Sequence, residues 1–300
     1  MAPPTLLARW PSSNPQSAIP LLARSLSVSR GATQQGRRAV QIRTLRLPAH
    51  EQQGQQGRNL FMVRTLDGAT ERVDVLVQDP AAPPRSSFST KGKGKATQQD
   101  DDDDLMIMND AQEQKQESSD GHSRWTFASI GALPSLPSAT NNGHLFDTFI
   151  QRALFLPPPP GAPPGQLGGG FWQPRAAAVS IEGFVFSVGD WEVKIGSVLI
   201  KGGTASGTTK GCLVEATYLP VPYLPSTSTF VRDFLLSLFP AAAVQNGEIE
   251  LVDVGEEDLF EAGMLDRPDP AKGGNEGEWE WREKHSTYAY VHQFKKEGLL

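Results

Sequence analysis

The sequence predicts an α+β protein in which antiparallel strands are covered by amphipathic helices. Residues 176–188 and 191–201 are apolar stretches joined by Gly189-Asp190, and the second alternates with period two, which is typical of an antiparallel hairpin. A second hairpin is indicated where Asp67-Gly68 separates two β-rich runs. Helices are indicated by adjacent apolar pairs that recur every four residues.

Length and composition indicate one core with flexible insertions. The chain has 300 residues, 24 Pro, 29 Gly and a hydrophobic share of 38%, below the usual ~45–50%. Residues 79–123 combine the "KGKGK" stretch, the acidic run Asp100–Asp104 and a Gln/Glu/Ser tract. Low hydrophobicity with blocks of like charge predicts disorder there. The Pro/Gly stretch 157–170 is predicted to be a linker. The core would then consist of residues 1–78, 124–156 and 171–300.

The distribution of charge bears on partners and compartment. Residues 1–50 contain seven Arg and no acidic residue, whereas the rest of the chain is acidic and brings the net charge to −6. An acidic body does not favour binding to nucleic-acid phosphates. One cysteine, Cys212, excludes an internal disulfide. No apolar run approaches the ~20 residues of a membrane span.

The Arg- and Ser-rich N-terminus has two interpretations. It is typical of a mitochondrial transit peptide, and it equally fits a strand and a helix of the fold with arginines facing solvent. The "KGKGK" stretch is a weak candidate for a nuclear-import signal. Composition alone leaves these alternatives open.

Further elements are expected along the chain. In the N-terminal half, residues 16–27 can form an amphipathic helix with Pro20 in its first turn. In the C-terminal half, residues 212–218 alternate as a half-buried strand. Additional strands are expected at 39–47, 124–131 and 248–254, and additional helices at 142–155, at 226–239 and at the C-terminus.

The loop "KGGTASGTTKG" tests the possibility of a nucleotide site. A phosphate-binding loop needs a lysine directly after its last glycine and a helix behind it. Here Gly202 and Gly207 have the right separation, but Lys210 comes two residues late and a strand follows. The same strand argues against a G-x-S-x-G nucleophile elbow. The loop is therefore predicted to connect a hairpin.

The remaining candidates for chemistry are weak. His285 and His292 lie seven residues apart, two helical turns, whereas chelation needs three or four residues. Cys212 fits a core position. The carboxylates of Glu182, Glu192 and Glu215 are explained by polar faces of strands. A flexible run such as Asp100–Asp104 lacks a preorganised cation cage. We therefore expect no catalytic, cofactor-binding or metal-binding residue.

Aromatic residues offer a candidate for binding another protein. Trp172, Phe184, Phe186 and Trp191 gather around one predicted hairpin. Phe184 and Phe186 share one strand face while apolar residues also occupy the other, so this sheet must be covered twice. Internal packing and a partner protein are both open explanations. These four aromatic residues are the candidate partner interface.

The order of these elements resembles subunit 20 of the Mediator complex. The resemblance is carried by "DWEVKIGSVLI", the Gly-rich turn, "KGCLVEATYLP" and "FVRDFLLSLFP", and is densest over Phe186–Pro240. It extends more loosely to residues 6–78, to the helix at 142–155 and to the C-terminal "YAYVHQF". The insertions at 79–123 and 157–170 depart from the family pattern.

This resemblance implies a fold and a role. The fold would be an antiparallel β-barrel-like sheet with packed helices. The role would be that of a non-enzymatic coactivator subunit of the Mediator head module, paired with subunit 18 and with subunit 8 as a further candidate partner. It would act in RNA polymerase II transcription in the nucleus, without cofactor, membrane, small-molecule or direct nucleic-acid binding. The alternative is a mitochondrial β-rich protein or enzyme with an N-terminal transit peptide.

Overall fold

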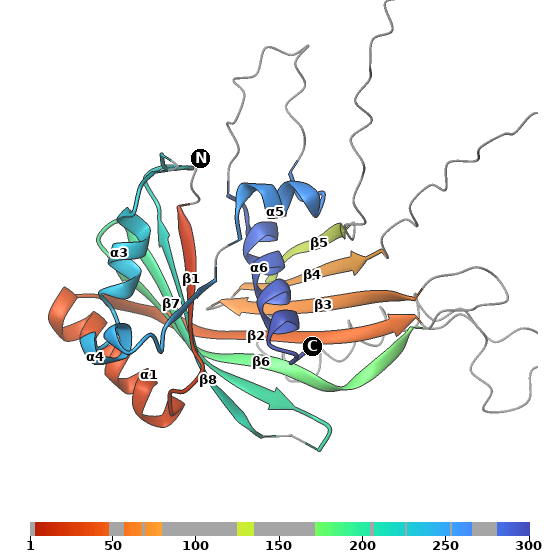
Figure 1. Cartoon of the computed structure of the whole chain (residues 1–300), viewed down its shortest axis with the longest axis horizontal. Helices are drawn as coiled ribbons and strands as arrows, with labels where there is room; N and C mark the ends of the chain where they lie inside the picture. The colour runs from red at the N-terminus through yellow and green to blue at the C-terminus, as the bar shows by residue number, and fades with distance from the viewer. Residues whose placement is uncertain are drawn as a thin grey trace, which may run out of the picture.

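The computed structural model describes a single antiparallel sheet of nine strands with helices packed on it (Figure 1). The strand order is β5-β4-β3-β2-β6-β7-β8-β1-β9. In the described part of the chain β5 and β9 are the two edges, so the sheet is open and does not close into a barrel. The α+β prediction is confirmed. The structure describes residues 4–47, 57–67, 70–79, 125–134, 172–204, 207–225, 227–252, 254–265 and 281–300.

The strands follow the predicted order along the chain, and β2 begins earlier than the strand expected at 39–47. They are β1 (Thr5–Trp10), β2 (Thr33–Leu47), β3 (Arg58–Asp67), β4 (Thr70–Gln78), β5 (Trp125–Pro134), β6 (Gln173–Val188), β7 (Trp191–Lys201), β8 (Thr209–Tyr218) and β9 (Glu250–Val252). The helices are α1 (Pro15–Arg24), the π-helical turn η1 (Ser25–Ser29), α3 (Phe230–Leu236), α4 (Ala241–Gln245), α5 (Glu256–Glu261) and α6 (Glu283–Lys296).

The three predicted hairpins are present. β3 pairs with β4, β6 with β7 and β7 with β8, all antiparallel. The glycine loop that resembles a phosphate loop connects β7 to β8, as predicted. Gly202 there has φ of +80°, and a Cβ at this position would lie 2.2 Å from the carbonyl oxygen of Ala176. Glycine is therefore required by the close approach of two strands.

The N-terminal helix starts earlier than expected. Asn14 caps it by accepting a hydrogen bond from the N–H of Gln16 at 3.0 Å, and Pro15 occupies its first turn. Pro20 therefore lies inside the helix, and its expected place in the first turn was wrong. Its ring is exposed, and it removes one backbone hydrogen bond from the helix. The helix then continues as η1.

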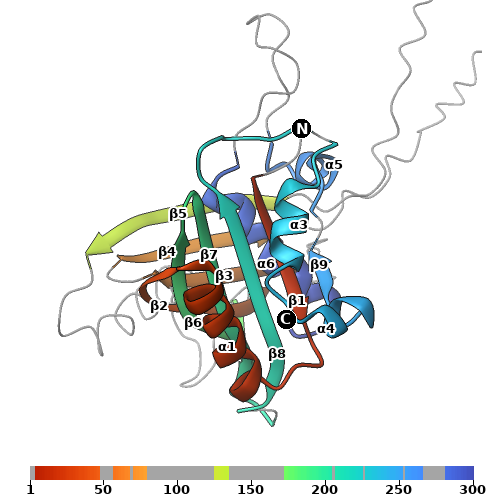
Figure 2. The same ribbon diagram turned by 90° about the vertical axis from the view of Figure 1, so that its left-hand side faces the viewer.

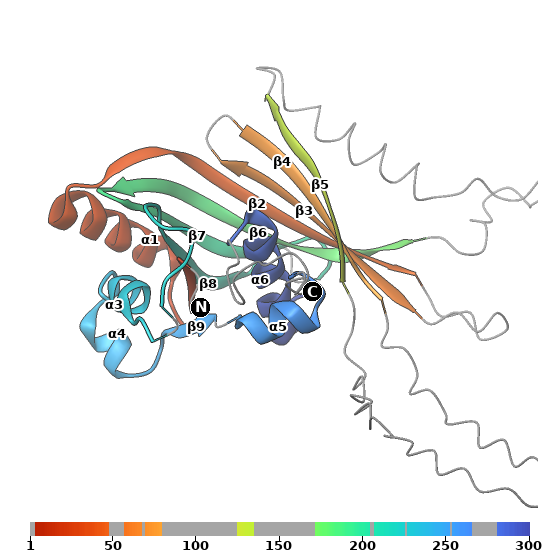
Figure 3. The ribbon, with the colours of Figure 1, turned by 90° about the horizontal axis from the view of Figure 1, so that it is seen from above.

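Helices cover both faces of the sheet. On one face α5 and α6 pack over a core that includes Val40, Phe61 and Ile181. On the other face α1, α3 and α4 pack over Phe186 and Ile195 with their neighbours (Figures 2 and 3). This confirms that the sheet is apolar on two faces and is covered twice. Strand β8 is buried on both sides from Cys212 to Ala216, so its expected half-exposure was wrong.

Some expectations concern parts of the chain outside the described residues. These are the helix at 142–155, the linker at 157–170 and nearly all of the insert at 79–123. Within the described ranges no helix has the length and apolar character needed to cross a membrane.

Candidate functional site

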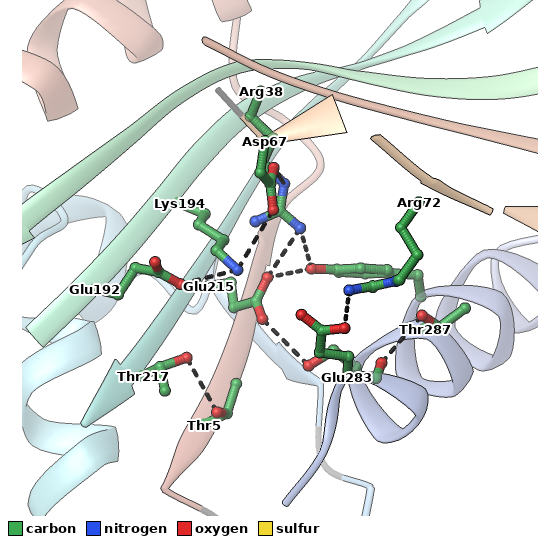
Figure 4. A network of polar contacts seen from close by, with 12 residues as sticks. Thr5, Arg38, Asp67, Arg72, Glu192, Lys194, Glu215, Thr217, Glu283 and Thr287 are labelled. Carbon is green, nitrogen blue, oxygen red and sulfur yellow. Dashed lines mark hydrogen bonds and ion pairs between the residues drawn. The ribbon is translucent and has the colours of Figure 1, made fainter. Parts of the chain in front are cut away.

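A buried network of charged groups lies between the sheet and α6 (Figure 4). Arg38 on β2 places its Nη2 atom 3.1 Å from Oε2 of Glu215 on β8, although the two strands are not neighbours in the sheet. Arg38 is 4% exposed and Glu215 2% exposed. The Nε atom of Arg38 also lies 3.7 Å from the carboxylate of Asp67. The two side chains therefore reach across β6 and β7 to make this contact.

Side chains of helix α6 add hydrogen bonds to the network. The hydroxyl group of Tyr290 accepts a hydrogen bond from Arg38 and donates one to Glu215. The hydroxyl group of Ser286 donates to the other oxygen of Glu215 at 3.3 Å. Both oxygens of this buried carboxylate are thus engaged, and the helix supplies two of the donors. This satisfies a charge that would otherwise be costly to bury.

The network also fixes protonation states. Burial alone would raise the pKa of Glu215, but Lys194 and Arg38, with the hydrogen bond from Tyr290, lower it to about 2. Burial opposes the charge of Lys194, yet Glu215 and other carboxylates raise its pKa above the usual value. Burial raises the pKa of Tyr290 well above its ordinary range. At neutral pH the carboxylate and both cations are therefore charged, and the phenol keeps its proton.

Two further polar contacts hold α6 on the sheet. Asp74 on β4 is fully buried and accepts a hydrogen bond from Thr287 of the helix at 2.8 Å, and others from Arg72 and Ser129. Just beyond the C-terminal end of the helix, Glu297 accepts two hydrogen bonds of 2.8 Å from the guanidinium of Arg9 on β1. The helix and the residue after it are thus linked to strands at both ends of the sheet.

A cavity of about 480 Å³ opens beside the network. Lys194, Glu215 and Thr217 line one side, and Leu219 and Trp281 lie among the apolar lining residues. The charged groups pair with one another, and the cavity exposes one side of the network. The described carboxylates and cations mainly bind one another.

The cavity adjoins a cluster of aromatic rings. The rings of Trp191 and Phe234 are stacked, with centroids 3.8 Å apart, and the rings of Phe230 and Tyr218 lie 5.1 and 5.0 Å from that of Trp191. Phe230 is 46% exposed, Leu219 59% and Tyr223 36%. We call Leu219, Tyr223 and Phe230 the aromatic surface. Its three side chains are apolar and exposed, and Phe230 rests on the packed rings of Trp191 and Tyr218.

The structure places the four predicted interface residues as follows. Phe186 and Trp191 are buried in the core under α1 and α3, and Phe184 packs partly buried against the same core. Trp172 packs against a separate small cluster that contains Leu45 and Leu60. The hairpin thus brings three of the four together. Their role in partner binding stays a prediction, and Trp191 supports the exposed residues of the aromatic surface.

The carboxylates singled out in the sequence are split between the two faces. Glu182 is exposed and paired with Lys201, and Glu192 lies 2.9 Å from Lys194, as expected for polar strand faces. Glu215 was wrongly assigned to a surface face, since β8 is covered on both sides. It is the one member of the set that joins the buried network.

The two histidines and the cysteine are packing residues, as expected. His285 is 1% exposed and accepts a hydrogen bond at Nδ1 from the N–H of Arg282, which closes the first turn of α6. The ring of His292 stacks on that of Tyr288. Cys212 is fully buried. Among the described residues no group of three or more His, Cys, Asp or Glu is placed to hold a metal ion.

Three residues of the network, Arg38, Lys194 and Tyr290, were not predicted from the sequence. For Arg38 the two open interpretations were a transit peptide and a solvent-facing position, and Lys194 was placed on the polar face of a strand. A signal was present in the C-terminal helix, where the run from Thr287 to Val291 has no charged residue and is fully buried. A helix buried on several sides must satisfy its polar groups within the core.

The fold and the network together define an α+β protein with an open antiparallel sheet. Its C-terminal helix is held on the sheet by buried polar contacts. No protein-family model matches the chain, and no curated protein matches it in sequence. Among solved structures it is similar to the PH1819 protein of Pyrococcus horikoshii, with 8% identity, a TM-score of 0.30 and coverage of 85% of this chain and 96% of that one.

Two further solved structures are similar. A Hippeastrum protein with a dominant triphosphatase activity has 12% identity and a TM-score of 0.33, with 87% of this chain and 96% of that chain covered. A chain of the Schizosaccharomyces pombe Mediator head module has 11% identity and a TM-score of 0.25, with 82% and 96% covered. These are distant likenesses of fold.

Proposed function

We propose that this protein is a non-enzymatic subunit of the Mediator coactivator complex that binds a related head-module subunit and acts in RNA polymerase II transcription. The observation that carries the proposal is the internal pairing of Arg38, Glu215 and Tyr290 beneath α6. A catalytic carboxylate or an anion site needs groups that are left open to a substrate. Glu215 lines the neighbouring cavity, but both of its oxygens are already engaged by Arg38 and by side chains of α6. This engagement supports a structural role alongside the resemblance over 186–240.

The aromatic surface is the part of the molecule we assign to the partner. Exposed aromatic side chains that rest on a packed cluster are typical anchors of protein interfaces. Phe230 fits this description, because its ring contacts both Trp191 and Tyr218 while nearly half of it is exposed. The cavity beside it, lined by Leu219 and Trp281, can accept a side chain from the partner.

The N-terminal region supports the nuclear assignment over the mitochondrial one. Residues 5–47 supply β1, α1, η1 and β2, and both β1 and β2 are internal strands of the sheet. Arg9 and Arg38 from this region are buried and paired with Glu297 and Glu215. Cleavage of a leader ending near residue 50 would remove two strands and both of these pairs.

Co-expression with Mediator subunit 18 tests the proposal. We expect a stable one-to-one heterodimer at micromolar concentration in size-exclusion chromatography with light scattering. Phe230→Ser should weaken the heterodimer at least about tenfold. Val28→Ser, which changes an apolar residue that is 74% exposed in η1, is the matched control and should bind normally.

Two separate monomers for the wild-type chain would contradict the proposal. Fractionation of cells with N-terminal sequencing provides a second check. Mitochondrial protein shortened at its N-terminus would favour the mitochondrial alternative.

A further inference from the structure

A basic pocket lies on the face of the sheet opposite α6, where β2 ends and β6 begins. It has a volume of about 280 Å³, and Arg43, Arg175 and Lys201 line it together with polar and apolar residues. No acidic residue is part of this described lining. The chain as a whole carries a net charge of −6. The three cations around this small pocket therefore give it a positive charge, opposite in sign to the net charge of the protein.

An enlarged bulge in the sheet forms this pocket. Arg43 pairs with Ala178, but the next pair is Leu45 with Pro174, so three residues of β6 lie opposite Thr44 alone. Bulges of this kind redirect side chains out of the regular pleat. The end of β7 packs against the bulge, and Gly202 is required there by its contact with Ala176. The pocket is thus lined by residues of four strands, β2, β3, β6 and β7.

Two of the cations of the pocket, Lys201 and Arg175, are accessible to an anion. Lys201 forms an ion pair with Glu182, but both side chains are about half exposed, at 50% and 47%. Exposed pairs of this kind are weak. Arg175 projects from the bulge in an exposed stretch of β6. A doubly charged anion could therefore bind Lys201 and Arg175 together without breaking a buried ion pair.

We propose that this pocket binds a phosphoryl group, either free or carried on a phosphorylated side chain. Guanidinium groups match phosphate oxygens through paired hydrogen bonds, and a phosphate dianion matches several cations better than a single carboxylate does. The volume lies just below the ~300–1,000 Å³ of typical small-molecule sites, which favours a compact group. The site is remote from α6 and does not depend on the Mediator assignment.

Calorimetry on the full chain at low ionic strength tests the proposal. The probes are inorganic phosphate and three versions of one peptide, carrying phosphoserine, serine or aspartate. We expect phosphate or the phosphoserine peptide to bind, and the serine peptide not to bind. Tighter binding of the phosphoserine peptide assigns the group to a protein side chain, whereas binding of phosphate alone assigns it to the free anion.

Variants locate the site. Arg175→Gln and Lys201→Gln should each weaken binding about tenfold, or ~1.4 kcal/mol. Arg37→Gln, an exposed arginine near the other end of β2, is the matched control and should change affinity less than about twofold.

Three results would overturn the inference. The first is no binding of either phosphate probe. The second is equal binding of the aspartate and phosphoserine peptides, which would indicate general attraction of acidic chains such as the run Asp100–Asp104. The third is an equal loss of affinity in Arg37→Gln and Arg175→Gln, because it would remove the pocket as the binding site.

Discussion

Arg9 and Glu297 are joined across nearly the whole length of the chain. Two hydrogen bonds of 2.8 Å connect the guanidinium of Arg9, which is fully buried on β1, to the carboxylate of Glu297 just after α6. The same guanidinium donates to the carbonyl oxygens of Cys212 and Lys210 on β8. One side chain thus connects an internal strand, its neighbour and the C-terminal segment.

This relationship predicts that the C-terminus contributes to global stability. Glu297→Ala leaves a buried guanidinium without its counter-charge and should lower the free energy of unfolding by about 3 kcal/mol. Urea unfolding at pH 7 measures the change. Lys296→Ala, an exposed neighbour, should stay within about 0.5 kcal/mol. Equal effects of the two substitutions would show that the ion pair does not hold the terminus.

The depressed pKa of Glu215 predicts a loss of stability in acid. Burial disfavours its charge, but Lys194, Arg38 and Tyr290 together lower its pKa from 4.5 to about 2. A carboxyl group with a folded pKa below its unfolded value stabilises the fold above the unfolded pKa. This contribution, about 3 kcal/mol, should be lost as the pH falls from ~5 to ~2.

Unfolding of the Glu215→Gln variant across this pH range is the check. The variant should be less stable than the wild type at pH 7, and the difference should shrink toward pH 2. A constant difference between the two proteins would mean that Glu215 is already protonated at neutral pH.

His285 predicts a second acid effect in a different pH window. Burial, together with Lys284 and Arg282, lowers its pKa from 6.5 to about 4. A histidine with a depressed pKa is neutral in the fold and binds protons more readily when unfolded. Its contribution, about 3 kcal/mol, is therefore complete above pH 6.5 and is lost as the pH falls toward 4.

His285→Asn keeps an acceptor near Nδ1 and removes the titrating ring. The variant should show a flatter stability profile between pH 6.5 and 4 than the wild type does. Thermal melts at half-unit pH intervals measure the profile. An unchanged slope would assign the acid sensitivity in this window to other groups.

Alanine at two glycines near the β7–β8 turn is predicted to lower the free energy of unfolding by different amounts. Gly211 has φ of +76°, and a Cβ would lie 2.1 Å from the carbonyl oxygen of Trp10. Gly207 has φ of +82° with nothing within 4 Å. Gly211→Ala should cost more than about 3 kcal/mol, whereas Gly207→Ala should cost about 1 kcal/mol from backbone strain alone. Chemical denaturation separates them, and similar costs would contradict the close strand contact.

The aromatic cluster predicts that stability and partner binding can be separated. Trp191 is 8% exposed, and Trp191→Ala should cost about 3–5 kcal/mol by leaving a cavity. Phe230→Ala should cost roughly 1 kcal/mol, since nearly half of its side chain is already in solvent. Thermal unfolding measures both. A large loss for Phe230→Ala would make it a core residue and remove it from the aromatic surface.

Local patterns in the sequence determined much of the fold. Period-two alternation and the turn at Gly189-Asp190 were enough for the β6–β7 hairpin, because strand faces and turn glycines are set by neighbouring residues. Pro240 and the apolar stripe before it predicted α3 for the same reason. A strand after Lys210 was also predicted from the alternation of residues 212–218, and β8 confirms it.

Only the tertiary structure decided which charges are buried. Arg38 and Glu215 are 177 positions apart and lie on strands that the topology separates by two others, so no local pattern distinguishes them from solvent-facing residues. Their side chains meet across β6 and β7, and α6 then covers them and supplies Tyr290. Burial of an ion pair depends on what packs over a strand from elsewhere in the chain, and the residues of the strand itself do not encode it.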